Sequence, residues 1–345
     1  MTTFSEVYTN NRLQLHHIIP LDFNSLQAVP DSHIWPKSDD DVPTSDEYLS
    51  IPIVDLMDPD VVDRVSHACQ TWGIFQVTNH GLSPSLLEGV EEETWRLFSL
   101  PVPEKMKVLR LPDGATGYGT ARIAPFYSKS MWHEGFTIMG GSFVEHAKVL
   151  WPNDYKRFCD VIDECQKSMK TLAHKLLHII LKSLNLSEEQ ESNWATKIHQ
   201  SETNALQLNS YPTCPDPNQA IGLPPHTDSL LLTILHHSNT SGLQIFRDGG
   251  FGWVPVSSVP GALTVNVGDL LHILSNGKFP TVYHRVVVSG TCHRVSMGYF
   301  YGLPVDSTVE PLSKVEFPMY KSLTVREYIG IKNECHEKAL SLIRI

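Results

Sequence analysis

The sequence carries few charges, and most of them are acidic. Only 19% of the 345 residues are Asp, Glu, Lys or Arg, and 38 acidic residues against 27 basic ones give a formal net charge of −11. No basic stripe is visible, and because affinity for phosphate depends on clustered Lys and Arg, we expect no nucleic-acid partner. No stretch approaches the roughly 18–20 consecutive apolar residues of a membrane span, so we expect no membrane partner either.

Cysteine is also scarce. The six cysteines form no C-x-x-C pair, and the N-terminal residues, which include Glu6, lack the basic-then-apolar order of a secretory signal. Scattered free thiols in a chain of this size are typical of a reducing compartment. We therefore expect a cytoplasmic protein, with the nucleus as a further option, that acts as a monomer on a small molecule.

Apolar residues are plentiful enough for a large core, at 41%. Residues 1–50 are polar and punctuated by proline, and are predicted to form an N-terminal arm. Residues 51–200 are predicted to be rich in helix, and residues 311–345 to be a C-terminal helical segment of the same structural unit. The helices that apolar spacing predicts are 61–72, 84–98, 153–184 and 325–340.

Residues 201–310 have a different pattern, in which short β-rich runs alternate with Gly, Pro, Asn and Asp. Many short strands at such spacing are typical of a sandwich or barrel. The predicted strands are ALQLNSY, LLLTILHH, GLQIF, GWVPV, ALTVNV, LLHIL, TVYHRVVV and RVSMGYFYG. The sequence therefore predicts a mainly β fold with flanking α-helices, in one domain without a separating linker.

A candidate metal site begins at His226 and Asp228, directly before one of these strands. On an extended backbone, residues two apart point the same way, so both side chains can bind one ion. His284, in a later strand, can supply a third ligand. Two His and one carboxylate on one face of an iron leave three positions open, as in non-haem Fe(II) oxygenases. An exposed turn histidine beside a loop aspartate is the structural alternative for the H-x-D pair.

Arg294 and Ser296 lie shortly after His284, again two apart in a predicted strand. An oxygenase that decarboxylates a dicarboxylic keto acid needs a fixed cation for the far carboxylate, and an arginine with a neighbouring hydroxyl supplies it. A structural Arg–Asp pair is the alternative reading. A zinc hydrolase could also use two His and one Asp, but it would leave Arg294 and Ser296 without a purpose.

These motifs together resemble a known family. H-T-D, the later His and R-x-S, with WGIFQVTNHG near the N-terminus and NSYPTCPDP before the metal segment, are similar to the plant Fe(II)- and 2-oxoglutarate-dependent dioxygenases over about residues 50–340. The resemblance implies a distorted double-stranded β-helix, or jelly roll, wrapped by helices. It implies O₂ as a cosubstrate and ascorbate as a reductant. The implied iron ligands are His226, Asp228 and His284, and the implied 2-oxoglutarate residues are Arg294, Ser296, Tyr211 and Asn209.

A narrower resemblance links the chain to the plant gibberellin 3-beta-hydroxylases. The motifs that carry it are MWHEGFTI, ARIAPF, HTDSLLLTIL, GLQIFRD and VNVGDLLHILSNG. It implies hydroxylation of gibberellin precursors at carbon 3, on the beta face, to give bioactive gibberellins, with 2-oxoglutarate converted to succinate and CO₂. Pro224 and Pro225 before H-T-D depart from the expected pattern, which leaves open a sister dioxygenase acting on another gibberellin carbon or another plant metabolite. A non-catalytic jelly-roll ligand-binding protein is the alternative of a different class.

The mouth of the barrel should hold the substrate. A gibberellin is a rigid apolar polycycle with a carboxylate, so it needs an apolar and aromatic wall and a cation. Arg122 or Lys129 could pair with the carboxylate, and plain core packing is the alternative for each apolar residue. The predicted wall residues are Phe126, Tyr127, Met131, Trp132, Phe136, Leu323 and Tyr328.

Overall fold

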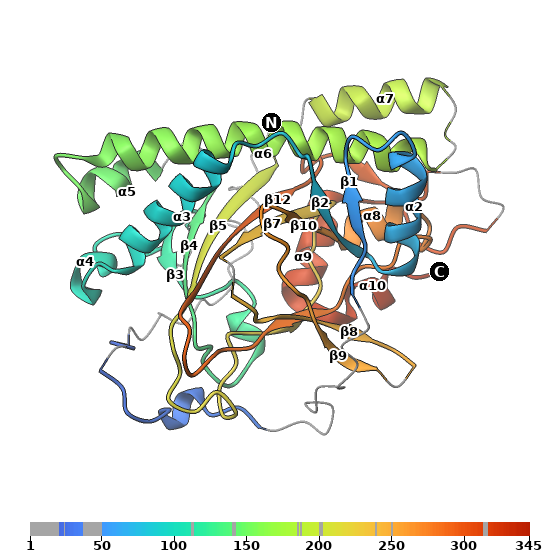
Figure 1. The fold of residues 1–345 in the computed structure, drawn as a ribbon. Coiled ribbons are helices and arrows are strands. Elements are labelled where there is room, and N and C mark those ends of the chain that lie inside the picture. Colours follow the sequence, from blue (N-terminus) through green and yellow to red (C-terminus); the bar gives the residue numbers. More distant parts are fainter. Residues whose placement is uncertain are drawn as a thin grey trace.

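The computed structural model of the protein describes residues 21–23, 25–36, 50–111, 114–139, 143–184, 186, 188–199, 203–238, 240–249, 251–312 and 317–345. Its centre consists of a larger and a smaller β-sheet, with helices outside them (Figure 1). Side chains from both sheets line one shared cavity, so the sheets face each other across it. This is the jelly-roll core that the sequence resemblance implied.

Hydrogen bonding defines the order of strands within each sheet. The larger sheet runs β1 (Ile53–Asp55), β2 (Ile74–Thr78), β10 (Leu263–Val267), β7 (Leu232–His237), β12 (Arg294–Tyr301), β5 (Asn204–Tyr211), β4 (Glu134–Ile138) and β3 (Gly117–Gly119). The smaller sheet runs β6 (Leu223–His226), β11 (His284–Val286), β8 (Leu243–Arg247) and β9 (Gly252–Pro255). A short ribbon pairs β13 (Thr308–Val309) with β14 (Leu323–Thr324). Only β1 and β2 are parallel among the described pairs, so the core is built from antiparallel neighbours.

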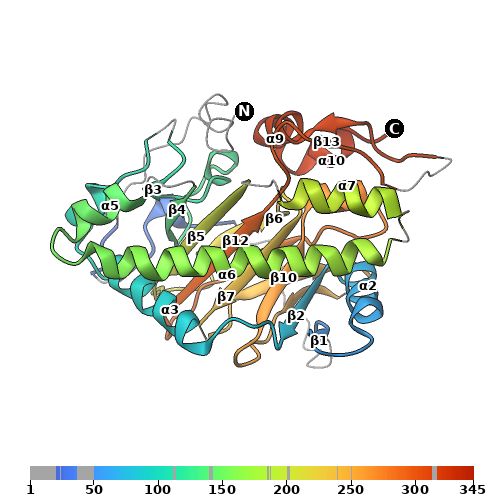
Figure 2. The same cartoon turned by 90° about the horizontal axis from the view of Figure 1, so that it is seen from above.

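Helices surround this core on several sides. The α-helices are α2 (Val61–Thr71), α3 (Pro84–Phe98), α4 (Val102–Met106), α5 (Phe143–Leu150), α6 (Tyr155–Lys182), α7 (Glu188–His199), α8 (Asp269–Leu274), α9 (Val325–Cys335) and α10 (Ala339–Leu342). The short 3-10 helices are η1 (Asp31–His33), η3 (Ala124–Phe126) and η5 (His336–Lys338). In the view from above, the long α6 runs in front of the larger sheet and across its strands, and it contacts β7 and β12 (Figure 2).

The predicted long helix is confirmed as α6. Its apolar residues recur every three or four positions, so a single face is apolar, and Phe158, Ile162 and Met169 on that face are buried. Each fully buried aliphatic or aromatic side chain contributes roughly 1.5–3 kcal/mol. The packing reaches the sheet directly, since Cys165 Sγ lies 3.6 Å from Met297 Sδ of β12. Burial of this face therefore fixes α6 against the strand that carries Arg294.

The prediction of a strand for LLHIL, residues 270–274, is wrong, because these residues belong to helix α8. A short, continuous apolar run fits a buried strand and a buried helix equally well, so periodicity could not separate them. The backbone amide of Asp269 donates to the Asp228 carbonyl at 2.8 Å, and that of Leu270 donates to the Ser229 carbonyl. These bonds start the helix directly behind the H-T-D segment.

The predicted C-terminal helix is confirmed only in part. α9 begins with a capping box, in which the Thr324 hydroxyl accepts from the Glu327 amide and the Glu327 carboxylate accepts from the Thr324 amide. It ends at Cys335 because His336 adopts a φ of 47°, in the left-handed region that stops an α-helix. The chain then continues as η5 and α10 rather than as one helix to residue 340.

Much of the predicted N-terminal arm, namely residues 1–20, 24 and 37–49, lies outside the described residues. The part that is described packs onto the body, where Phe23 contacts the Trp132 ring edge-on at a centroid distance of 4.9 Å. Within the described ranges, none of the helices has the length and apolar character needed to cross a membrane.

Candidate active site

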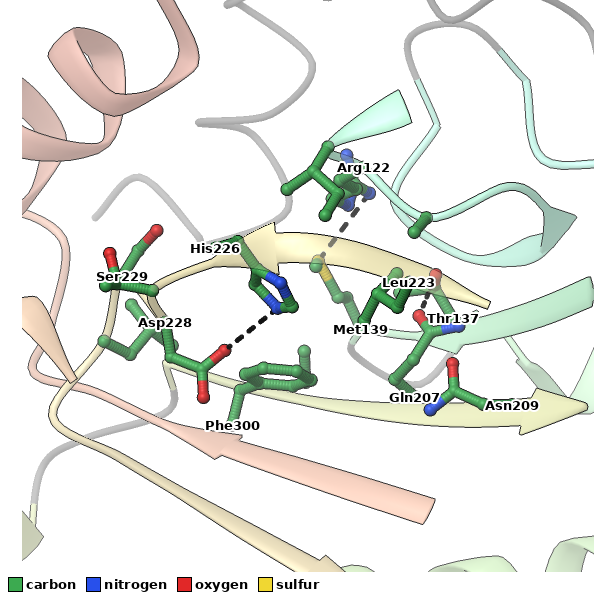
Figure 3. A pocket seen from close by; sticks show the side chains of 15 residues that line it. Arg122, Thr137, Met139, Gln207, Asn209, Leu223, His226, Asp228, Ser229 and Phe300 are labelled. Carbon is green, nitrogen blue, oxygen red and sulfur yellow. Dashed lines mark hydrogen bonds and ion pairs between the residues drawn. The ribbon is translucent and has the colours of Figure 1, made fainter. Parts of the chain in front are cut away.

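Three predicted metal ligands meet at one point between the strands of the smaller sheet. His226 ends β6 and His284 begins β11, and the two residues are direct partners in the antiparallel pairing. Asp228 follows β6, and its Oδ1 lies 3.8 Å from His226 Nε2 and 3.9 Å from His284 Nε2. All three side chains are buried, and one potential ligand atom from each falls within 4.8 Å of the others. Figure 3 shows His226 and Asp228 turned toward each other.

Both histidines are held in the tautomer that a metal requires. His226 Nδ1 lies 2.8 Å from the Pro224 carbonyl, and His284 Nδ1 lies 3.2 Å from the Val282 carbonyl. A carbonyl only accepts, so each Nδ1 carries the proton and each Nε2 keeps a free lone pair directed at Asp228. Burial, followed by the neighbouring His284 ring, lowers the pKa of His226 to about 3, so this imidazole stays neutral as a metal ligand must.

The carboxylate of Asp228 stays ionised. Burial by itself would raise its pKa, but the nearby His284 and His226 and a hydrogen bond from Asn266 outweigh burial and hold the pKa below its ordinary value. Two neutral nitrogens and one charged oxygen on one face, with cavities on the other side, form a donor set that fits Fe(II).

Arg294 occupies the inner end of the cavity between the sheets. The pairing of β12 with β5 sets Arg294 opposite Tyr211 and Ser296 opposite Asn209. The guanidinium is buried, lies 5.1 Å from the centre of the Tyr211 ring, and reaches the Ser296 hydroxyl at 3.5 Å. Its Nε finds no hydrogen-bond partner in the described part of the chain. A buried guanidinium with an unsatisfied donor fits the far carboxylate of 2-oxoglutarate.

This inner cavity brings all seven predicted iron and cosubstrate residues together. Its lining includes Asn209, Tyr211, His226, Asp228, His284, Arg294 and Ser296. Five residues of its lining, Asn209, Leu223, His226, Asp228 and Phe300, also line a second, outer pocket. The two spaces therefore meet at the predicted metal ligands His226 and Asp228, so a molecule in the outer pocket would face these two side chains (Figure 3).

The outer pocket has an apolar wall with a few polar groups. Among the described residues that line it, Asp228 is the one acidic side chain and Arg122 the one arginine or lysine. Apolar lining comes from Ala121, Ile123, Met139, Ala205, Leu223, Leu230 and Phe300. Such a pocket suits an apolar molecule that carries a single anionic group.

Of the predicted substrate residues, the structure places only Arg122 among the described residues that line this pocket. Trp132 is buried and donates from its Nε1 to the Pro212 carbonyl at 3.0 Å. Phe136 packs in the main core, and Met131 is buried beside Trp132 in the chain. All three side chains are buried and none is among the described residues that line the outer pocket, so the structure places them in core packing, the alternative reading for each.

The remaining residues predicted to form the pocket wall lie in or near the C-terminal segment. The Tyr328 hydroxyl donates a hydrogen bond to the Asp269 carboxylate at 2.7 Å, and Leu323 belongs to the short strand β14. Phe126 stacks on His336 at a centroid distance of 4.5 Å, and the Tyr127 hydroxyl donates to the Pro225 carbonyl. They brace the segments around the site rather than line the outer pocket.

Lys129, the second predicted carboxylate partner, also points elsewhere. Its Nζ donates to the Asp31 carbonyl at 2.9 Å. That contact joins the loop before β4 to η1 of the arm, so we assign Lys129 no role in the pocket.

Two polar pocket residues, Thr137 and Gln207, were missed from the sequence. Buried Arg110 donates to the Thr137 hydroxyl at 2.7 Å, and that hydroxyl lies 2.6 Å from Gln207 Oε1. A guanidinium only donates, so the Thr137 hydroxyl accepts from Arg110 and donates its own proton to Gln207 Oε1. This hydrogen bond fixes the orientation of the Gln207 side-chain amide. No sequence motif marks this relay, because its members come from three separated segments.

His133 was also passed over, and it supports the cosubstrate end of the site. Its Nε2 lies 2.9 Å from the Asn209 side-chain oxygen, and Asn209 in turn donates to the Ser296 hydroxyl at 3.4 Å. Burial lowers the pKa of His133 to about 4, so the ring is neutral, and donation to an amide oxygen puts the proton on Nε2.

Comparison with known proteins agrees with the fold. A model of the 2OG-Fe(II) oxygenase superfamily matches residues 202–303, and one described as the non-haem dioxygenase in morphine synthesis N-terminal matches residues 51–155. The chain belongs to the 2OG-Fe(II) oxygenase superfamily, as a 2-oxoglutarate-dependent dioxygenase that uses Fe(II). Its curated relatives include gibberellin 3-beta-dioxygenase 1 of Pisum sativum, 45% identical over 100% of this chain and 94% of the relative. Gibberellin 3-beta-dioxygenase 1 of Arabidopsis thaliana is likewise 45% identical, over 99% of this chain and 97% of the relative.

A solved structure supports the same class. The crystal structure of JOX2 in complex with 2OG, Fe, and JA matches 88% of this chain and 89% of its own, with a TM-score of 0.74 and 31% identity.

Proposed function

We propose that the protein hydroxylates gibberellin precursors at carbon 3, on the beta face, and so produces bioactive gibberellins. In the same reaction 2-oxoglutarate is decarboxylated to succinate and CO₂. The observation that carries this proposal is the 45% identity to gibberellin 3-beta-dioxygenases over almost the full length of both chains. An apolar pocket with one arginine, opening on the three grouped ligand side chains, supports it.

In this proposal each group of site residues has one role. His226, Asp228 and His284 bind Fe(II), and Arg294 with Ser296 holds the far carboxylate of 2-oxoglutarate. Tyr211 and Asn209 add polar contacts near the same cosubstrate. When bound, Fe(II) with 2-oxoglutarate and O₂ supplies the oxidising chemistry for an aliphatic C–H bond, and ascorbate serves as the reductant that keeps the iron ferrous.

The residues of the outer pocket orient the substrate. Met139, Leu230 and Phe300 form an apolar wall against the rigid ring system, and Arg122 pairs with the substrate carboxylate. The protein's contribution is to fix one carbon near the metal and to keep water away from it.

We further propose that the protein acts as a monomer in the cytoplasm, with the nucleus as a second compartment, and without nucleic-acid or membrane partners. The acidic net charge supports the absence of a nucleic-acid role. A small-molecule gibberellin is then its partner.

The test is product analysis with a panel of gibberellin precursors, in the presence of Fe(II), 2-oxoglutarate, ascorbate and O₂. We expect a single new hydroxyl at carbon 3, on the beta face. Oxidation at another carbon would replace this proposal by a sister dioxygenase activity, and turnover that persists without O₂ would indicate a metal hydrolase. Binding without substrate-dependent succinate release would indicate a non-catalytic ligand-binding protein.

A further inference from the structure

Helix α9 reaches the metal segment through a buried ion pair. Lys332 Nζ lies 2.7 Å from Asp269 Oδ2, and the Tyr328 hydroxyl, one turn earlier on α9, donates to the same oxygen at 2.7 Å. The Asp269 side chain is 0% exposed and that of Lys332 is 8% exposed. Such a pair is weak evidence for stability, because removing both charges from water costs about as much as their attraction returns. Its geometry therefore suggests a role in fixing position.

Both members of this ion pair are hydrogen-bonded to Thr227, the residue between two of the proposed iron ligands. Lys332 Nζ donates to the Thr227 hydroxyl at 2.6 Å, and that hydroxyl lies 3.3 Å from Asp269 Oδ2. An ammonium only donates, so Thr227 accepts from Lys332 and gives its own proton to Asp269. The three groups are therefore mutually bonded, and one of them, Thr227, is the residue between His226 and Asp228.

A second contact ties the same aspartate to the backbone of a ligand. The Asp269 amide donates to the Asp228 carbonyl at 2.8 Å. Both the side chain of Thr227 and the main chain of Asp228 are thus bonded to Asp269, and Asp269 is bonded to α9.

The C-terminal segment also contacts the strand of the third ligand. Just beyond α9, Glu337 accepts a hydrogen bond from the Tyr283 hydroxyl at 2.5 Å, and Tyr283 directly precedes His284. One short stretch of chain, 328–337, is therefore bonded to residues beside all three ligands.

We propose that Lys332 is a positioning residue for the iron site, and that α9 holds the His226–Asp228 segment in its metal-binding geometry through Thr227. The proposal rests on the proposed iron ligands. Partners that orient metal ligands without touching the metal commonly contribute 10–100-fold to metal affinity. Lys332 acts through Thr227 and Asp269 and has no contact with substrate in this proposal.

The test measures Fe(II) affinity of the full-length protein without turnover. Fe(II) is titrated anaerobically into protein saturated with 2-oxoglutarate, and the thermal midpoint of the metal-free protein is measured alongside. We expect Lys332→Met to raise the Kd for Fe(II) by roughly 10-fold or more. Lys338→Met is the matched control, because Lys338 is exposed and directly follows this stretch, and its Kd should equal that of the wild type.

Two further variants separate positioning from stability. Thr227→Val leaves the Lys332–Asp269 pair and the Asp269 amide bond to Asp228 in place and removes only the side-chain link through Thr227, so it should raise the Kd with little change in thermal midpoint. Lys332→Met with Asp269→Asn removes both buried charges, so the thermal midpoint should recover relative to Lys332→Met while the Kd stays raised. Thr227→Val also keeps the test decisive if Lys332→Met does not fold.

The outcomes distinguish this inference from the proposed function. A wild-type Kd in Thr227→Val, or a Kd in the double variant that recovers together with the thermal midpoint, would overturn the positioning role and leave the iron site intact. Failure of the wild-type protein to bind Fe(II) would instead overturn the iron ligands themselves.

Discussion

At the scale of single residues, the site depends on groups that are buried and held in one protonation state. His226 and His284 each donate Nδ1–H to a carbonyl two residues earlier on their own chain, which directs Nε2 at Asp228. Burial then keeps His226 neutral by lowering its pKa to about 3, and the histidines in turn help to keep Asp228 charged. The local backbone therefore prepares the donor set before any metal arrives.

A first prediction concerns the affinity for 2-oxoglutarate and a single residue, Arg294. Arg294→Ala should raise the KM for 2-oxoglutarate about 10–100-fold, because a charge-assisted hydrogen bond contributes roughly 1.5–3 kcal/mol. Steady-state kinetics with varied 2-oxoglutarate measures this change. Arg294→Lys, which keeps the charge but loses the planar fork, should give an intermediate KM. An Arg294→Ala enzyme with the wild-type KM would remove the cosubstrate role.

The residues that a local motif could mark were predicted from the sequence, and those that depend on three-dimensional contacts were not. His226 and Asp228 share one face by strand alternation, and Arg294 and Ser296 do so for the same reason. Thr137 and Gln207 carry no such pattern, since only the pairing of β4 with β5 brings them side by side. Trp132 and Phe136 were expected in the pocket because aromatic residues suit an apolar substrate, but they suit the core equally well.

At the scale of elements, helices with an apolar face were predictable and buried apolar runs were not. The spacing in α6 specifies a helix because one face is apolar and the other charged. α8 is apolar on nearly every side, so its sequence could not distinguish a helix from a strand. The end of α9 depends on the positive φ of His336, a residue whose ring stacks on Phe126, and this tertiary contact is invisible in the local sequence.

A second prediction concerns the contact between β4 and β5, where Thr137 lies opposite Gln207. Thr137→Val should raise the KM for the gibberellin about 2–10-fold, since one hydrogen bond contributes roughly 0.5–1.5 kcal/mol and the Gln207 amide would lose its fixed orientation. The KM for 2-oxoglutarate should stay constant, because Thr137 lines the outer pocket and is absent from the described lining of the inner cavity.

Thr137→Ser is the matched control for this change. Serine keeps a hydroxyl that can accept from Arg110 and donate to Gln207, so its gibberellin KM should remain near that of the wild type. Equal KM values in the valine and serine variants would show that the relay does not orient the substrate.

At the scale of the whole molecule, the two cavities join parts of the chain that are far apart in sequence. The outer pocket takes side chains from residues 121–139, 205–209, 223–230 and 300. The inner cavity adds side chains from β7, β8, β10 and β11, and further ones from β5 and β12. The residues predicted for the metal and the cosubstrate were found from the sequence because each set is a short motif, and the structure brings them together. The substrate end was only partly predictable, because its shape exists only once both sheets and the segment before β4 have come together.

The central claim, that this fold couples 2-oxoglutarate decarboxylation to gibberellin 3-beta-hydroxylation, is tested most directly by stoichiometry. Protein loaded anaerobically with Fe(II), 2-oxoglutarate and a gibberellin precursor is exposed to O₂, and succinate and 3-beta-hydroxylated product are counted. We predict equal amounts of the two, and neither from Asp228→Ala, which lacks the carboxylate ligand. Wild-type turnover by Asp228→Ala, or succinate that never depends on the gibberellin, would contradict the account.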